Sequence, residues 1–365
     1  MMFKGLKSQC RDERAFYQRQ LELGLDVIVN LPPRPPHVIN DHYNLHGLPV
    51  SYHAGVAVSE HIEVLPDESM PLLVKEYHTP AGMLRTEVRQ TADWRWGDHV
   101  PFLDDYIIPR ARKPLVTRAA DLDALRYLLI PPTAEECRAF HAESLPMIQF
   151  AKEQGLALSA GWGVGADMLG WLCGLENMVF LSYDQPDFLA ELLGLIADWN
   201  RKRMAVVLSK PVDLFIKRAW YENCDFFTPD NWRKFIQPIL KADVEAAHQA
   251  GVMFGYIITS NAMPLLEAIM ACGVDVLIGV DPHQYDLQQA TDMAAGKMCL
   301  WGGVNGHLTV EQGRPDEVRA EVSRAMRIAR SRGGFILSPV DNVRQWSPII
   351  ESNVKALIAA WGALV

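Results

Sequence analysis

Short apolar runs alternate with longer stretches of helical pattern through most of the chain. Each run is apolar at nearly every position, which is typical of strands buried on both faces of a parallel sheet. The runs cover residues 25–31, 156–160, 213–219, 252–257, 274–279, 298–301 and 335–338. Regular alternation of such strands with helices predicts an α/β fold.

Local signals mark where the intervening helices begin and end. Thr133 and Glu136 have the spacing of a capping box. Thr228 followed by Pro229 is a strong helix start, and that helix is expected to continue to Gly251. No glycine-rich nucleotide loop follows the first strand, and the chain length suits a barrel. We therefore predict a (β/α)8 TIM-type barrel rather than a doubly wound sheet.

Residues 32–132 do not follow the alternation and are rich in proline and aromatic residues. Within them, residues 72–91 resemble a β-hairpin whose turn is Thr79-Pro80-Ala81-Gly82. We interpret this stretch as a long N-terminal insertion that lies over the barrel mouth. The whole chain, residues 1–365, is then predicted to be one barrel domain.

Composition excludes several classes of protein. The 365 residues carry a net charge of −9. Nucleic-acid binding is not expected, because the chain has no excess of Lys and Arg to neutralise the phosphates. No apolar run reaches membrane-spanning length, and the charged N-terminus lacks the apolar core of a signal peptide. The six cysteines are scattered without a CxxC pair, which favours reduced thiols and a cytoplasmic protein.

The active site of a barrel lies at the carboxyl ends of its strands. This rule selects four candidate catalytic residues: Glu222, Tyr256, His283 and Asp341. A carboxylate, a phenol and an imidazole can supply an acid, a base or metal ligands. Simpler interpretations stay open. Glu222 can solvate its loop, His283 can be an exposed histidine, and Asp341 can form an Asx turn.

Polar and aromatic residues near the same ends are candidates for substrate binding. They are Trp162, Tyr221, Asn261, Asn305, Trp346 and His99. Asn261 can equally cap a helix, and Trp346 can belong to an ordinary surface loop. His99 lies in the insertion, near a Trp94-Arg95-Trp96 segment that can stack on an aromatic substrate or pack the insertion itself.

Several segments resemble the uroporphyrinogen decarboxylase superfamily in order and spacing. They are residues 121–129, 232–251, 263–275, 302–306 and 333–341. The resemblance covers most of the chain and implies a uroporphyrinogen decarboxylase-like barrel. In this comparison the chain begins after the place of the family's first strand, so that strand is expected to be missing or atypical.

The chain departs from two branches of that superfamily. True decarboxylases carry an arginine-rich first strand and a histidine after the eighth strand, where this chain has Asp341. Zinc methyltransferases carry a His-x-Cys pair after the fifth strand and a cysteine after the eighth. The matching positions here are Ile257, Thr259 and Asp341, so the usual zinc ligands are absent.

The resemblance then implies a methyltransferase of the O-demethylase type. It would pass a methyl group from a small methoxylated or methylated compound to a separate corrinoid protein, so the partner and not this chain would carry the corrinoid. Glu222, His283 and Asp341 would polarise the leaving oxygen, directly or through a metal such as zinc. A homodimer is expected by analogy with the family.

Two alternatives stay open. One is a metal-free lyase that decarboxylates a small aromatic or pyrrolic acid, with Asp341 or Glu222 as proton donor. Such an enzyme should place Lys217, Arg218 or Arg344 inside its pocket to hold a carboxylate. The other is a catalytically inactive barrel that binds a ligand or a partner.

Overall fold

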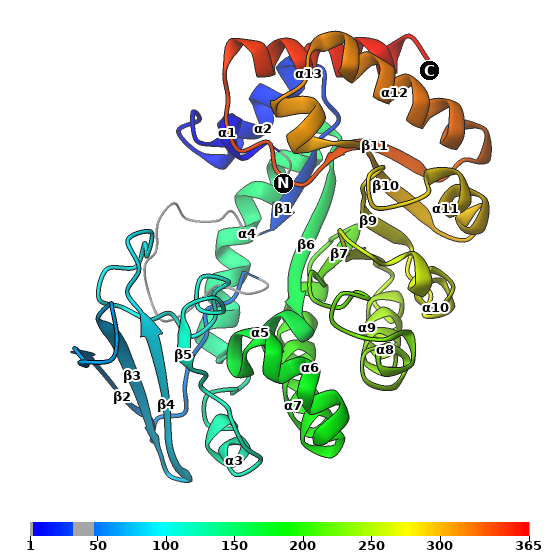
Figure 1. Cartoon of the computed structure of the whole chain (residues 1–365). Helices are drawn as coiled ribbons and strands as arrows, with labels where there is room; N and C mark the ends of the chain where they lie inside the picture. The colour runs from blue at the N-terminus through cyan, green and yellow to red at the C-terminus, as the bar shows by residue number, and fades with distance from the viewer. Residues whose placement is uncertain (1–2, 32–46, 365) are drawn as a thin grey trace. The chain divides into compact units, whose positions relative to one another are not determined.

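The computed structural model of the chain describes residues 3–31 and 47–364 (Figure 1). Contacts divide the chain into two compact units. The first unit comprises Met1–Arg34, Glu143–Ala160 and Lys210–Val365, and the second comprises Pro35–Ala142 and Gly161–Ser209. The prediction of a single domain, with residues 32–132 over the barrel mouth, stays a prediction.

A curved, seven-stranded parallel sheet forms the framework of the first unit. Its strands follow one another in chain order, as βα units require. They are β1 (Ile28–Leu31), β6 (Ala157–Val164, which ends in the second unit), β7 (Leu214–Arg218), β8 (Met253–Ile257), β9 (Val276–Val280), β10 (Cys299–Asn305) and β11 (Phe335–Val340). All seven coincide with predicted apolar runs, so the barrel-type α/β prediction is confirmed. An eighth parallel strand is not seen in residues 3–31 and 47–364, and the sheet is a half-barrel.

Helices separate the strands of this sheet and cover its outer side (Figure 1). They are α1 (Lys4–Lys7), α2 (Glu13–Glu22), α4 (Ala134–Gln154, which begins in the second unit), α8 (Pro229–Phe235), α9 (Gln237–Gln249), α10 (Leu266–Ala271), α11 (Leu287–Ala294), α12 (Pro315–Ala329) and α13 (Pro348–Gly362). None of the described helices is both long and apolar enough to cross a membrane.

The predicted helix starts are confirmed, but one predicted helix is two. Thr133 and Glu136 exchange the two hydrogen bonds of a capping box, and Thr228 accepts from the Asn231 amide at 3.2 Å. The single helix expected up to Gly251 breaks at Ile236. Pro238 explains the break, because proline lacks the N–H that would bond one turn back.

Strand alternation gives the sheet two chemically different faces. Leu214, Val276 and Ile278 form a buried apolar cluster on what we call the inner face. The opposite, outer face packs against the helices. There Phe215 contacts Phe254 at 5.8 Å between ring centroids.

A four-stranded antiparallel sheet characterises the second unit. Its strands are β2 (Ala57–Glu63), β3 (Leu72–Thr79), β4 (Gly82–Arg89) and β5 (Ala111–Lys113). The predicted hairpin is confirmed: Thr79 pairs with Gly82, and the Thr79 hydroxyl donates to the Gly82 carbonyl at 2.8 Å. The sequence did not reveal β2 and β5, because β5 is only three residues long and β2 is largely exposed.

The helices of the second unit are α3 (Asp121–Leu125), α5 (Ala166–Cys173), α6 (Leu175–Asp184) and α7 (Pro186–Leu208). Trp94 lies in an apolar cluster with Leu73, Val88, Val100 and Ile107. This tryptophan therefore packs the second unit internally, which was one of the two interpretations left open.

Candidate functional site

The inner face of the sheet is apolar and partly open. Four half-buried residues, Ile216, Ile257, Cys299 and Trp301, pack around its buried cluster. The indole N–H of Trp301 is buried and has no hydrogen-bond partner among the described residues. Buried donors nearly always have a hydrogen-bond partner, so we expect a ligand or a water molecule to accept a hydrogen bond from this N–H. Sequence analysis did not select Trp301, although a tryptophan before Gly302-Gly303 was the available signal.

Arg218 ends β7 on the same face as Leu214 and Ile216, as strand alternation requires. It is only 5% exposed, and its guanidinium lies 3.8 Å from the centroid of the Trp220 ring. A guanidinium group can stack on an aromatic ring, and its planar set of N–H donors can bind a carboxylate. The carboxyl end of β7 therefore adds a positive charge to the inner face.

Glu222 and Tyr256 are brought together. The Tyr256 hydroxyl donates to a Glu222 carboxylate oxygen, and the two residues are 0% and 1% exposed respectively. Tyr256 alternates with Ile257 along β8, so its side chain leaves the sheet on the outer face. The pair is therefore buried on the outer side of the sheet and does not reach the apolar inner face. The catalytic role of both residues stays a prediction.

The loops after β7 and β8 are tied to each other by Asp225. Asn261 donates to this carboxylate at 2.8 Å, and the Ser260 hydroxyl donates to it at 3.1 Å. Asn261 thus bridges two strand ends and is not the helix cap that we considered, because Ala262 precedes the next helical turn. Tyr221 packs against Phe226 with 5.3 Å between ring centroids.

Asp281 and Asn305 join the ends of β9 and β10. The Asn305 amide donates to Asp281 Oδ2 at 2.8 Å, and the His283 backbone N–H donates to Oδ1 at 2.9 Å. The Asn305 side-chain oxygen in turn accepts from the Leu308 amide at 2.7 Å. Since both carboxylate oxygens accept hydrogen bonds, Asp281 anchors these loops and positions Asn305.

Asp341 follows β11 and is exposed. Its carboxylate accepts from the Asn342 amide at 2.7 Å and lies 3.5 Å from the Arg344 guanidinium. Asp341 has φ +65°, and Asn261 has φ +33°. These are the non-glycine residues with positive φ in the described part of the chain. Both lie at strand ends, and unfavourable backbone conformations of this kind cluster at functional sites.

Two further predicted substrate-binding residues, Trp346 and His99, make contacts of other kinds. Trp346 packs edge-on against Phe3, with 6.1 Å between ring centroids. His99 belongs to the second unit, where its ring is 2.9 Å from a Glu60 carboxylate oxygen. The side chain of Trp162 lies outside the described residues. These contacts do not show a role in substrate binding, and that role stays a prediction for all three residues.

The predicted metal ligands do not form a set. Glu222 is buried against Tyr256, Asp341 is paired locally, and His283 is half-exposed. In residues 3–31 and 47–364, no group of three His, Cys, Asp or Glu side chains is arranged to hold a metal ion. A zinc ion needs three or four such ligands. The residues present therefore do not fit a metal at this site.

Glu311 is a further acidic residue that sequence analysis missed. It is hydrogen-bonded to the His307 ring at 2.8 Å and accepts from the amides of Arg344 and Gln345. Burial by itself would raise the pKa of Glu311, but these hydrogen bonds outweigh it and hold that pKa below its usual value. Glu311 lies in the π-helix Gly306–Glu311, and π-helical turns are frequent at functional sites.

The sequence profile of the uroporphyrinogen decarboxylase (URO-D) family matches residues 95–362. The chain therefore belongs to this family, and the predicted resemblance is confirmed. Family and fold together indicate an enzyme of the uroporphyrinogen decarboxylase superfamily. No curated protein matches the chain in sequence.

Solved structures share the fold. A methyltransferase from Methanosarcina mazei is similar over 96% of this chain and 84% of its own, with 18% identity and a TM-score of 0.53. A B12-independent methionine synthase from a Shewanella species is similar over 59% of this chain and 64% of its own, with 11% identity and a TM-score of 0.40. At these identities the first likeness shows the fold alone, and the second is too distant to support an argument.

Proposed function

We propose that the inner face of the first unit binds a small, mostly apolar, methoxylated or methylated compound, and that the enzyme passes its methyl group to a separate corrinoid protein. The observation that carries this proposal is the unpartnered N–H of Trp301 on an apolar surface. Such a surface suits a ligand with one acceptor oxygen, because ligand sites are mostly apolar with a few polar groups that fix orientation.

A methyl ether supplies that oxygen. Ile216, Ile257 and Cys299 would contact the hydrocarbon part of the ligand, and the Trp301 N–H would donate to the ether oxygen. An oxygen that lacks a proton accepts a hydrogen bond without offering one, so it satisfies the indole and leaves no new unpaired donor. A reaction that transfers a methyl group also agrees with the fold that the chain shares with a protein named a methyltransferase.

During transfer the methyl–oxygen bond breaks, and its electron pair remains on the oxygen. Preorganised donors and cations that face such a developing charge lower the barrier. Trp301 would donate to this oxygen, and the Arg218 guanidinium would supply positive charge from the end of β7. The corrinoid protein, when docked, supplies the acceptor of the methyl group. No protein-bound metal is required by this arrangement of residues.

The test uses the full chain with cob(I)alamin as acceptor and a panel of methoxyphenols and methoxybenzoates as donors. Formation of methylcobalamin and of the demethylated phenol is expected together. Trp301→Phe keeps the ring but removes the donor, so kcat/KM should fall at least tenfold, because a hydrogen bond to a charged group contributes about 1.5–3 kcal/mol.

Trp232→Phe is the matched control. Trp232 also has a buried, unpartnered indole N–H, but it lies in α8 and not on the inner face. This variant should keep the activity of the wild type per folded molecule. Equal activity of wild type and Trp301→Phe, or an absence of methylcobalamin with every donor, would overturn the proposal.

A second candidate, decarboxylation of a small aromatic or pyrrolic acid, is favoured by one observation. Arg218 is a cation on the inner face, as a lyase of this kind should have, whereas Lys217 is directed to the outer face toward Asp243. Release of carbon dioxide from pyrrole-2-carboxylate or hydroxybenzoates, abolished in Arg218→Met, would favour the lyase over the methyltransferase.

A further inference from the structure

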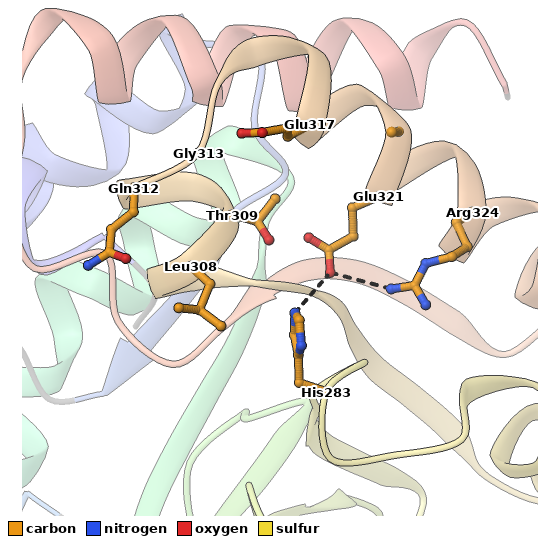
Figure 2. Close-up of a pocket in the computed structure, with 9 residues that line it drawn as sticks. His283, Leu308, Thr309, Gln312, Gly313, Glu317, Glu321 and Arg324 are labelled. Carbon is orange, nitrogen blue, oxygen red and sulfur yellow. Dashed lines mark ion pairs between the residues drawn. The ribbon is translucent and has the colours of Figure 1, made fainter.

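An open pocket of about 650 Å³ lies in the first unit between α12, the π-helix Gly306–Glu311 and the loop after β9 (Figure 2). Its lining combines charged, polar and apolar side chains. The charged or titratable ones are His283, Glu317, Glu321 and Arg324. None of the residues that line this pocket belongs to the apolar cluster of the inner face.

Glu321 is the unusual member of this lining. It projects from α12 into the pocket, toward His283 (Figure 2), and is 9% exposed. One carboxylate oxygen is 3.5 Å from the Arg324 guanidinium and 4.0 Å from the His283 ring, which are ion-pair distances too long for strong hydrogen bonds. The other oxygen is buried without a hydrogen-bond partner among the described residues.

A buried carboxylate in this condition has lost hydration without receiving donors in return. Such a loss costs about 1–3 kcal/mol or more for a charged group. The other carboxylate of the pocket is already used, because Glu317 accepts from the Arg314 amide at 2.7 Å in the cap of α12. Arg324 and His283 are both half-exposed, so either side chain can turn toward water and make room for a better donor.

We propose that this pocket binds a small organic cation with a primary ammonium group. The ammonium would donate to the Glu321 carboxylate, which it can approach more closely than Arg324 or His283 do. An aliphatic chain would lie on exposed Leu308, and Thr309 and Gln312 offer a hydroxyl and an amide to further polar groups of the ligand. A metal ion is a poorer occupant, since the described residues provide no group of three ligands.

This site is independent of the proposed methyl transfer, so the two can succeed or fail separately. The probe is n-butylammonium chloride, titrated into the full chain by calorimetry, with n-butanol as an uncharged probe of the same length and sodium chloride as the ionic-strength control. Butylammonium should bind, and butanol and sodium should not.

Glu321→Gln is the decisive variant, because the amide keeps the shape and removes the charge. It should weaken butylammonium binding at least tenfold, as expected for a charge-assisted hydrogen bond. Glu317→Gln changes a carboxylate of the same rim that already serves the helix cap, and it should bind within about twofold of the wild type.

Three outcomes would overturn the proposal: equal binding of butylammonium by wild type and Glu321→Gln, equal binding of butanol and butylammonium, or no heat with any amine. Binding of magnesium or zinc chloride that competes with butylammonium and disappears in Glu321→Gln would also reject an amine site and assign a metal in its place. Circular dichroism and a thermal melt of each variant ensure that lost binding is not lost folding.

Discussion

Each of the two sheets buries a lysine, and the two lysines are accommodated differently. Lys217 in β7 of the parallel sheet donates to the Asp243 carboxylate of α9 at 2.9 Å, and both groups are buried. Lys75 in β3 of the antiparallel sheet is 0% exposed. It donates to the Val100 carbonyl at 2.6 Å and is 3.5 Å from a Glu60 carboxylate oxygen.

The difference shows how a buried amine can be tolerated. The helix packed on the outer face of the parallel sheet brings a carboxylate into direct contact with Lys217, so a charged pair is buried together. Burial lowers the pKa of Lys75 to about 6, because desolvation disfavours its charged form. We therefore expect Lys75 to be mostly uncharged at neutral pH.

The largest effect is expected from breaking the buried ion pair. Asp243→Ala leaves Lys217 as a buried charge without this carboxylate, which should cost about 3–5 kcal/mol of unfolding free energy. Urea unfolding at pH 7 measures it. The double variant Lys217→Met/Asp243→Leu should recover most of the loss, since an apolar pair of similar volume removes both desolvation costs. A double variant as unstable as Asp243→Ala would contradict this account.

A smaller loss is expected at the neighbouring pair on the same face. Tyr256→Phe removes one hydrogen bond to the buried Glu222 carboxylate, at a cost of about 1–3 kcal/mol. Urea unfolding measures the loss, and Tyr221→Phe, at a half-buried tyrosine, is the control. A more than tenfold fall in methyl transfer per folded molecule in Tyr256→Phe would contradict a purely structural role and would make this tyrosine catalytic.

The smallest expected effect is the change in the unfolding free energy with pH that Lys75 causes. Between about pH 6 and the ordinary lysine value of 10.5, the unfolded chain holds a proton that the folded chain has lost. Stability relative to Lys75→Met should therefore rise with pH by up to about 1.4 kcal/mol per pH unit. Urea unfolding at pH 6.5, 7.5 and 8.5 tests this, with exposed Lys113→Met as control. A constant difference across this range would show that Lys75 stays charged.

The sequence pattern predicted the parallel sheet well because its strands are continuous apolar runs between capped helices. Each of the seven runs, from residues 25–31 to 335–338, became a strand. The pattern was less informative about the second unit, where β5 is too short and β2 too exposed to differ from a loop. Pro238 was visible in the sequence, yet its break of the helix after Thr228 was not foreseen.

The sequence predicted which strand ends carry the candidate site residues, but it did not predict the hydrogen-bond partners of those residues. The rule that barrel chemistry lies at carboxyl ends selected His283 and Asn305, and the structure joins both to Asp281 through hydrogen bonds. It could not show that Tyr256 leaves β8 on the outer face, nor that the proposed metal ligands separate. It also did not select Trp301 and Glu321. Each of these has a buried polar atom without a hydrogen-bond partner among the described residues, which only the structure can show.

The sequence by itself determined the periodicity of strands and helices and the helix caps, because these depend on residues close together in the chain. It also determined the family, through the order and spacing of segments along the chain. Tertiary structure alone decided which face each strand residue occupies and which buried polar groups are paired. Lys217 and Lys75 illustrate the reason. Both are lysines in apolar strands, but Lys217 donates to the Asp243 carboxylate at 2.9 Å, whereas Lys75 donates to the Val100 carbonyl and lies 3.5 Å from a Glu60 carboxylate oxygen.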